Sequence, residues 1–246
     1  MKSRSKKSDS SKVEKLLVSF DLGRARTPNE LEAVAAEIGR AFVESPELRK
    51  IARPPRGLWK RYIEEVLPLI YLTRWLFPGR LDVRCQPNLA DSGNYDAVIS
   101  FPNGDEIMRL FVEFTYAKDG FEDSLRMEVL NDEGHVNMLG EVIHSGTKHT
   151  GHQIEVRDRV ALRSDVLERH RHLIVERIRA KANRRYGSNH ILVVVFDSFT
   201  GPRSDGEMVG LTSNLQSVID LSGLDFRSLY LLGSSGTIFS ELSLER

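Results

Sequence analysis

The sequence predicts an α/β protein in which helices cover a mixed central sheet. An apolar, β-branched run at residues 190–196, HILVVVF, is typical of a central buried strand. Three shorter strand patterns precede it, at 81–86, 95–100 and 108–117. A long helical pattern at 164–187 separates the third strand from the fourth. Strands interleaved with helices in this order favour a mixed sheet with helices on its faces.

The composition is that of an ordinary globular protein. The chain has 246 residues, enough for one substantial core, with 40% apolar and 28% charged residues. Its formal net charge is zero, so no global field would draw it to DNA, RNA or an acidic membrane. Nucleic-acid binding would have to come from a local basic patch. The single Cys85 excludes an internal disulfide and a multi-cysteine zinc motif, which suits a reducing cytoplasm.

Neither a membrane span nor a secretory signal is expected. The longest apolar stretch, VLPLIYLTRWLF at 66–77, is too short to cross a bilayer and contains Arg74. Residues 1–12 are basic and Ser-rich, and no apolar segment of a signal peptide follows them. The sequence therefore predicts a soluble, cytoplasmic protein without a membrane partner, and a disordered basic tail over 1–12.

Residues 13–56 are predicted to form a helical N-terminal extension. The segment at 12–22, KVEKLLVSFDL, fits either a short strand or a helix. The helix after it has a clear start, because Thr27 is a good N-cap, Pro28 falls at the first helical position and Glu30 completes a capping box.

The main domain is predicted over 57–246 and starts with a helix at 58–77. This helix has an apolar stripe, and Pro68 is expected to kink it. Residues 119–164 are polar and contain five glycines, which predicts a short helix near 122–131 followed by irregular chain.

The helix at 164–187 is expected to be capped by Asp165 and to stop at Gly187. After the buried strand, the pattern predicts a polar loop, a short helix near 212–221 and a C-terminal β-hairpin within 226–242.

Two carboxylates interrupt the apolar strands. Asp96 stands at the head of the second strand and Glu113 in the middle of the third, and an Asn-Gly pair predicts a hairpin between them. A two-residue turn would place Asp96 diagonal to Glu113, and a four-residue turn spanning 103–106 would place it directly opposite. Both registers put the carboxylates on one face, with β-carbons roughly 5–8 Å apart. A three-residue loop would separate them.

Two carboxylates this close cannot both stay ionised in a dry environment without a cation. A hard divalent ion such as Mg²⁺ is the simplest solution, and it would activate a phosphodiester towards attack by water. The alternative is an ordinary charge on each strand, with Asp96 at the surface and Glu113 paired with Arg109.

The order α-β-β-β-α-β, with Asp96 on the second strand and E-x-T at Glu113 to Thr115 on the third, resembles the PD-(D/E)XK nuclease superfamily. The resemblance covers roughly residues 57–197 and implies a restriction-endonuclease-like core. It also implies that Asp96 and Glu113 bind Mg²⁺ or Mn²⁺. Thr115 stands where the superfamily has the lysine that orients the attacking water. Threonine cannot supply that cation, and Thr115 is expected to offer a carbonyl or hydroxyl group nearby.

Some members of the superfamily carry this lysine on a nearby helix, and here the candidate is Lys181. It follows Ile174 and Ile178 on the apolar stripe of its helix, so it either snorkels past the sheet edge or aims at an anionic site. Lys118 is a weaker substitute, because it lies on the opposite strand face from Glu113.

The resemblance further suggests an acid from the first core helix. Glu64 and Glu65 are the candidates, and Glu64 is taken as the metal ligand. Arg184 and Arg185, beside Tyr186 at the end of a helix, are the candidates for contact with a phosphate backbone.

The function expected from these observations is a metal-dependent endonuclease that hydrolyses phosphodiester bonds of DNA, with RNA as the second choice. The first alternative is a catalytically inactive member of the same fold that binds nucleic acid or another protein. The second is a structural or regulatory protein whose carboxylates form buried ion pairs with Arg109 or Arg84. A homodimer is left open, since cutting both strands often requires two active sites.

Overall fold

A six-stranded mixed sheet organises the chain. The computed structural model describes residues 5–53, 55–90, 93–147, 151–182, 184–221 and 223–244. The strand order is β1-β2-β3-β6-β7-β8, in which β6 runs parallel to β3 and to β7 and the other neighbours are antiparallel. This confirms the predicted α/β class with a mixed sheet. The strands are β1 (Arg84–Pro87), β2 (Ala97–Asn103), β3 (Glu106–Ala117), β6 (His190–Phe196), β7 (Ser228–Gly233) and β8 (Phe239–Leu242).

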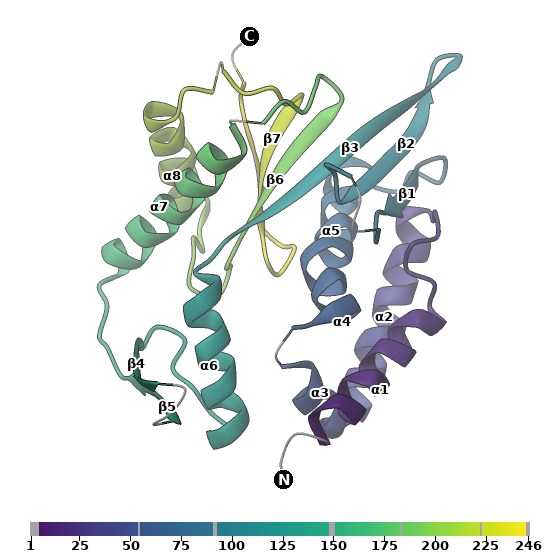
Figure 1. Cartoon of the computed structure of the whole chain (residues 1–246). Helices are drawn as coiled ribbons and strands as arrows, with labels where there is room; N and C mark the ends of the chain where they lie inside the picture. The colour runs from purple at the N-terminus through teal and green to yellow at the C-terminus, as the bar shows by residue number, and fades with distance from the viewer. Residues whose placement is uncertain are drawn as a thin grey trace.

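The N-terminal helices cover one face of the sheet (Figure 1). Their apolar side chains pack with Ile99 and Val112 and with alternate residues of β6, among them Val193. A short bridge between Arg26 and Cys85 ties this layer to the edge strand β1. The layer contains α1 (Ser5–Ser19), α2 (Pro28–Glu44), α3 (Pro46–Ala52), α4 (Gly57–Arg61), the π-helical segment η1 (Tyr62–Val66) and α5 (Leu67–Leu76).

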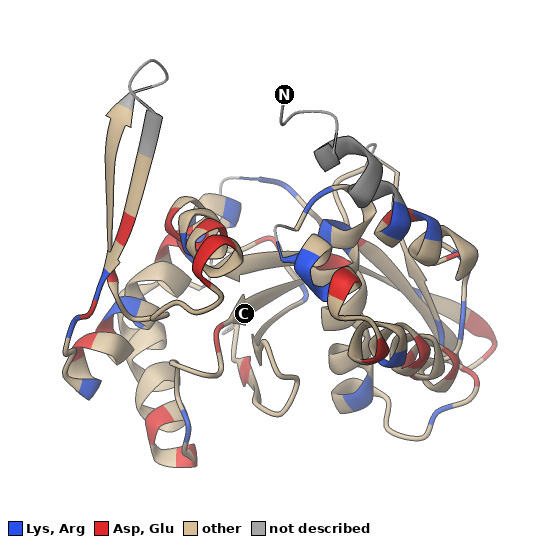
Figure 2. Cartoon of the chain, turned by 90° about the horizontal axis from the view of Figure 1, so that it is seen from below, with Lys and Arg blue, Asp and Glu red and all other residues tan. Residues whose placement is uncertain are grey.

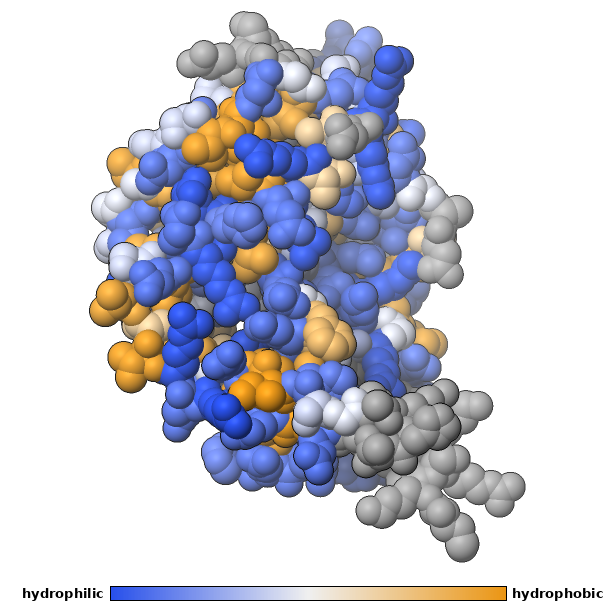
Figure 3. All heavy atoms as spheres, turned by 60° about the vertical axis from the view of Figure 1, so that its left-hand side comes forward, coloured by the Kyte–Doolittle hydropathy of each residue, from blue (hydrophilic) through white to orange (hydrophobic). Residues whose placement is uncertain are grey.

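Helices α7 (Arg163–Ala182) and α8 (Asp205–Val218) cover the opposite face (Figure 1). Ile174 and Ile178 of α7 pack there with Leu192 and Val194 of β6. Because successive residues of β6 point to opposite faces, both faces of this strand are buried, as its unbroken apolar run predicts. On the outer surface of this side, hydrophilic side chains dominate and apolar groups form separate patches (Figure 3).

The predicted capping box starts α2. The Thr27 hydroxyl accepts a hydrogen bond from the Glu30 amide at 3.2 Å, and the Thr27 amide donates to the Glu30 carboxylate at 2.7 Å. Pro28 occupies the first turn, as expected. The segment at 12–22, which fitted a strand or a helix, is helical through Ser19.

The helix predicted at 58–77 runs from Gly57 to Leu76, and a π-helical segment interrupts it just before Pro68. A π turn stands directly before the proline, and the Leu67 amide donates to the Tyr62 carbonyl five residues back. Proline has no amide hydrogen for the carbonyl four residues earlier and its ring crowds that carbonyl, so widening the preceding turn relieves both problems. This widened turn carries Glu64 and Glu65.

Four local expectations differ from the structure. Helix α1 begins at Ser5, inside the predicted disordered tail 1–12, because residues 5–12 contain no glycine or proline and extend a helix anchored by Val13 and Leu17. Asp165 lies in the first turn of α7 and not at its cap, and α7 ends at Ala182 and not at the predicted Gly187. Helix α8 starts earlier than the predicted 212–221, since Ser204 caps it.

The fourth difference is in the segment predicted to be irregular. Helix α6 (Gly120–Glu133) agrees with the expected short helix, and an antiparallel hairpin of β4 (Glu141–Thr147) and β5 (Gly151–Arg157) follows it. The hairpin stands away from the sheet next to α6 (Figures 1 and 2). The alternation that signals a half-buried strand is confined to β5, where half-buried Ile154 and Val156 alternate with exposed polar residues over 153–157.

The predicted C-terminal hairpin forms as β7 and β8 and extends the sheet beyond β6. Among the described residues, no helix is both long enough and apolar enough to cross a membrane.

The turn between β7 and β8 fixes this hairpin to α5, and this contact can be tested. Gly236 has φ 74°, and a Cβ there would lie 2.4 Å from a ring carbon of Tyr71. We expect Gly236→Ala to lower the free energy of unfolding by about 2–4 kcal/mol, because backbone strain and overpacking add.

The matched control is Gly104→Ala, which has φ 63° but open space around its Cβ. It should cost only about 1–2 kcal/mol. Urea denaturation of both variants measures the difference, and equal losses would show that Tyr71 moves aside without cost.

Candidate active site

The register of the β2–β3 hairpin brings the two strand carboxylates together. Ala97 pairs with Val112, and Asn103 pairs with Glu106 across the turn. This is the register of the four-residue turn over 103–106. The regular pairing ends at Ala97, one residue short of Asp96. Gly104 takes the first central position of the turn with φ 63°, which suits a type II′ hairpin.

Asp96 marks the point where β2 and β3 separate. Its amide donates to the Val112 carbonyl at 2.7 Å, and its carbonyl accepts from the Asn88 amide at 2.7 Å. Beyond this point the Phe114 amide donates to the Asp96 carboxylate, Oδ2, at 2.7 Å. The side chain thus takes the place of a further ladder bond, which holds its carboxylate in the fork between the strands.

Glu113 lies on the face of β3 that α7 covers and is only 7% exposed. Lys181, on the last turn of α7, donates a hydrogen bond from Nζ to Glu113 Oε1. The side chain of Lys181 is 18% exposed, so this is a largely buried ion pair. Of the two orientations open to Lys181 from its sequence, the structure shows the one aimed at an acid. Glu113 is therefore paired with Lys181 and not with Arg109.

Glu65 is the third carboxylate of the site. It comes from η1 in the opposite helical layer, and its Oε2 atom is buried without a hydrogen-bond partner among the described residues. Burial, and then the negative charges of Asp96 and Glu113, raise the pKa of Glu65 to about 7, although Arg61 opposes this.

Asp96 is perturbed in the same direction. Burial and the charge of Glu113 raise the pKa of Asp96 to about 6. The Phe114 amide and the positive charges of Lys181 and Arg61 limit the shift. The three carboxylates therefore form a partly desolvated cluster, in which the pKa values of Asp96 and Glu65 are raised by burial and by neighbouring negative charges.

Glu64, the predicted metal ligand, lies apart from this group. Its carboxylate forms ion pairs with Lys118 at 3.0 Å and with Lys60 at 3.7 Å. Lys118 thus contacts Glu64 and not Glu113, in agreement with its expected position on the other strand face. The charges of Asp96 and Glu113 act on Glu65, whereas the sequence favoured Glu64 as the third acid.

Thr115 is half-buried on the same strand face as Glu113, two positions along β3. Arg184 and Arg185 are exposed just beyond the end of α7. Tyr186, which follows them, is buried, and burial and the charge of Glu113 raise its pKa.

Sequence reasoning missed two residues near the carboxylates. Arg61 is one turn before Glu65 and favours the charged forms of Glu65 and Asp96. The second residue is His190, the first residue of β6. Burial lowers the pKa of His190, and the negative charge of Glu113 opposes this shift. Only the tertiary fold brings these positions together, so no local pattern could have identified them.

The donor set has the chemistry of a hard-cation site. Its ligand atoms are carboxylate oxygens, which Mg²⁺ and Mn²⁺ prefer. Glu65 Oε2 is buried without a partner in the described chain, and the pKa values of Glu65 and Asp96 are both raised. These carboxylates therefore have too little positive charge near them, and a bound cation would supply it. In the described part of the chain, however, no three His, Cys, Asp or Glu residues are arranged as a complete metal site. At Glu113 the neutralising cation in this arrangement is the ammonium group of Lys181.

Comparison with known proteins gives no match to a family model, to a curated protein or to a solved structure. The function must therefore be argued from the geometry of the site.

The raised pKa of Glu65 predicts a pH-dependent stability. A raised carboxyl pKa stabilises the fold fully below the unfolded value of 4.5, and this contribution is lost as the pH rises through about 7. We expect wild-type stability to fall by about 3 kcal/mol from this group between pH 4.5 and pH 8. Glu65→Gln should flatten the curve and exceed wild type in stability at pH 8, as measured by urea denaturation.

Glu64→Gln is the matched control, one residue away and engaged with Lys118. It should keep most of the wild-type slope, because Glu64 raises the pKa of Glu65 less than burial and Asp96 do. A Glu65→Gln protein with an unchanged slope would show that Glu65 is not coupled to the other carboxylates.

Proposed function

We propose that this protein is a Mg²⁺- or Mn²⁺-dependent nuclease that hydrolyses phosphodiester bonds of DNA, with RNA as the second choice. The observation that supports it best is the convergence of Asp96, Glu113 and Lys181 from three elements. A charge cluster in the interior of a sheet is costly to fold around unless it is used. Phosphodiester hydrolysis uses carboxylates and a lysine in this combination.

In this proposal Asp96, Glu113 and Glu65 hold the cation, with Glu65 in the place that the sequence gave to Glu64. When bound, the ion would polarise the phosphodiester and ease deprotonation of water. Lys181 would leave its pair with Glu113 and place its ammonium group against negative charge on the reacting phosphate. Thr115 would offer its hydroxyl group beside Glu113.

The order of elements supports a restriction-endonuclease-like core within the mixed sheet. Helix α5 is followed by the antiparallel β1, β2 and β3, and α7 then leads to β6, which is parallel to β3. This is the α-β-β-β-α-β order of the resemblance. Helix α6 and the β4–β5 hairpin form an insertion between β3 and α7.

A basic contact with the substrate strand would come from Arg184 and Arg185. Both are exposed at the end of the helix that carries Lys181. Such local contacts are needed, because the net charge of zero provides no long-range attraction. We further propose that the protein works in the cytoplasm, and as a homodimer if it cuts both strands.

The second candidate is an inactive member of this fold that binds nucleic acid or another protein. It is favoured by the loss of lysine at Thr115 and by the closed Glu113–Lys181 pair. A protein of this kind would bind DNA without cutting it.

A cleavage assay separates the two candidates. Plasmid and single-stranded DNA are incubated with pure protein in Mn²⁺. We expect Asp96→Asn, Glu113→Gln and Lys181→Met to lose about 100-fold or more in rate, because each removes a charge needed in the transition state.

Glu64→Gln should keep most of the activity and controls for general damage. Wild-type cleavage equal to that of the three variants would exclude the nuclease. Retained DNA binding in that case would favour the inactive module.

Metal binding can be tested without activity. Mg²⁺ at about 10 mM should stabilise the wild type at pH 8 by about 1.4 kcal/mol if its dissociation constant is about 1 mM. Thermal unfolding with and without Mg²⁺ measures this shift. It should vanish in Glu113→Gln and Asp96→Asn and persist in Glu64→Gln; equal shifts in all four proteins would mean that the ion binds elsewhere.

A further inference from the structure

Helices cover only part of one face of the sheet. On that side α7 and α8 pack against β6 and β7, and no described helix lies over β1, β2 or the outer half of β3 (Figure 1). None of the described residues that form the apolar core on this side comes from β1 or β2. These strands therefore present an open face, which borders the buried carboxylate of Glu113.

The strand register places the side chains of this open face in rows. Alternate residues of a strand point to the same side, so Arg109, Phe111 and Glu113 follow one another along β3. Their neighbours in β1 and β2 on the same side are Arg84, Gln86, Val98 and Ser100. None of these neighbours is acidic. A phosphate that approaches Glu113 along β3 therefore passes Arg109 before it meets a carboxylate of these strands.

Arg109 supplies free positive charge to the open face. It is exposed, and it has no hydrogen-bond or ion-pair partner in the described chain. Glu113, four residues further along β3, lies about 13 Å away at the usual rise of a strand. The guanidinium group is therefore within a few nucleotides of the place proposed for the reacting phosphate.

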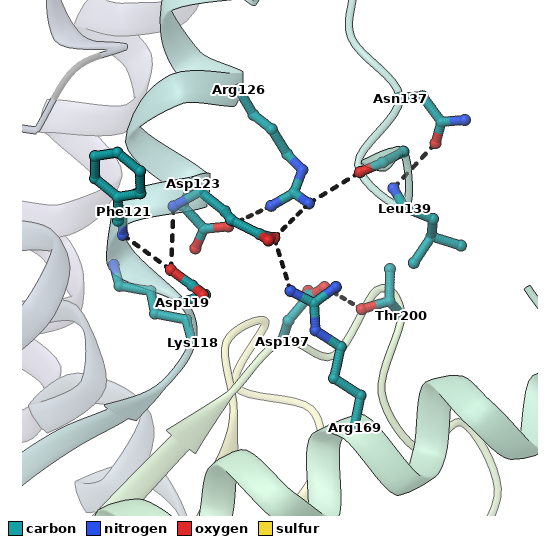
Figure 4. A network of polar contacts seen from close by, with 12 residues as sticks. Lys118, Asp119, Phe121, Asp123, Arg126, Asn137, Leu139, Arg169, Asp197 and Thr200 are labelled. Carbon is teal, nitrogen blue, oxygen red and sulfur yellow. Dashed lines mark hydrogen bonds and ion pairs between the residues drawn. The ribbon is translucent and has the colours of Figure 1, made fainter. Parts of the chain in front are cut away.

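The arginines beyond the other end of β3 are already neutralised. Arg126 of α6 and Arg169 of α7 both donate to the Glu122 carboxylate at 2.8 Å (Figure 4). Of these two arginines and Arg109, only Arg109 lacks an acidic partner in the described chain. The charge that is free to meet a polyanion thus lies on the open side of Glu113.

An apolar strip separates Arg109 from the carboxylates. The centroid of the Phe111 ring lies 4.9 Å from that of the Tyr95 ring and 4.9 Å from that of the His190 ring. These three residues and Val98, which is opposite Phe111 in β2, are half-buried, so part of each is accessible. Such a strip can contact the bases of an unpaired strand. The bases of a duplex are stacked inside it and cannot reach the strip.

We propose that a single strand of DNA crosses this open face to reach the carboxylates, with a phosphate at Arg109 and a base against Phe111. The inference rests on the nuclease proposal, because it takes the reacting phosphate to lie at Asp96 and Glu113. It narrows the substrate to an unpaired strand. Two features favour this occupant over a neutral protein partner: Arg109 needs a countercharge, and the open face is continuous with the carboxylate site.

Fluorescence anisotropy of the full chain at pH 8 tests the proposal. Ca²⁺ replaces Mn²⁺, so that binding is measured without cleavage. The probes are a labelled single strand of about 15 nucleotides and the duplex of the same sequence. The single strand should bind more tightly than the duplex by about fivefold or more, because it alone exposes its bases.

Two replacements separate the phosphate contact from the base contact. Arg109→Gln should reduce the steepness of log K against log salt concentration by about 0.7, the contribution of one phosphate of a single strand. Phe111→Leu should weaken binding of the single strand about fivefold and leave the salt dependence unchanged.

Arg40→Gln and Phe101→Leu are the matched controls. Arg40 is exposed on α2, in the layer on the other side of the sheet, and Phe101 is half-buried on the other face of β2. Both variants should bind like wild type. The proposal is overturned if the duplex binds as tightly as the single strand, if the two arginine variants have equal salt dependence, or if the two phenylalanine variants have equal affinity.

Failure of this proposal can be told from failure of the nuclease proposal. Metal-dependent cleavage by a protein whose DNA binding is indifferent to Arg109 and Phe111 would overturn the open-face proposal alone. Binding of single strands that depends on both residues, without metal-dependent cleavage, would overturn the nuclease and leave the open face as a binding surface.

Discussion

The buried ion pair between Glu113 and Lys181 is the constraint around which the centre of this fold is arranged. A carboxylate in the middle of a two-sided sheet costs several kcal/mol unless a cation approaches it closely. Helix α7 must therefore cross β3 so that its last turn faces Glu113, with Ile178 buried one turn earlier. A packed apolar pair of similar volume is often as stable as such an ion pair. Stability alone therefore does not explain the charges of Glu113 and Lys181, and we propose that they have a chemical role.

Strands β2 and β3 separate close to Glu113 as well. Asp96 bonds the Phe114 amide with its side chain, so the ladder ends and a fork opens beside Glu113. Glu65 comes to this fork from the opposite helical layer. At this fork, within the described chain, the charges of Asp96, Glu113 and Glu65 affect one another.

Much of this arrangement could be predicted from local patterns, and the remainder depends on tertiary contacts. The apolar run of β6, the capping box at Thr27 and the Asn-Gly hairpin each encode their structure within a few residues. Strand periodicity put Asp96 and Glu113 on one face, but only the folded hairpin selected between the two registers. The choice between Glu64 and Glu65 depended on a π turn, which ordinary helical periodicity does not reveal. The β4–β5 hairpin was missed because its one alternating run, at 153–157, is short and stands in an otherwise polar, glycine-containing segment.

Thr115 carries no charge, so the cation that neutralises Glu113 must come from another element. A lysine at residue 115 would project from the same face of β3, two positions from the carboxylate. Lys181 brings its ammonium group to that carboxylate from α7 instead. A long, flexible side chain can supply the same charge from either element, because electrostatic stabilisation depends on where the charge lies and not on which backbone carries it. A threonine at position 115 is therefore compatible with a cation at the Glu113 carboxylate, because Lys181 supplies it from α7.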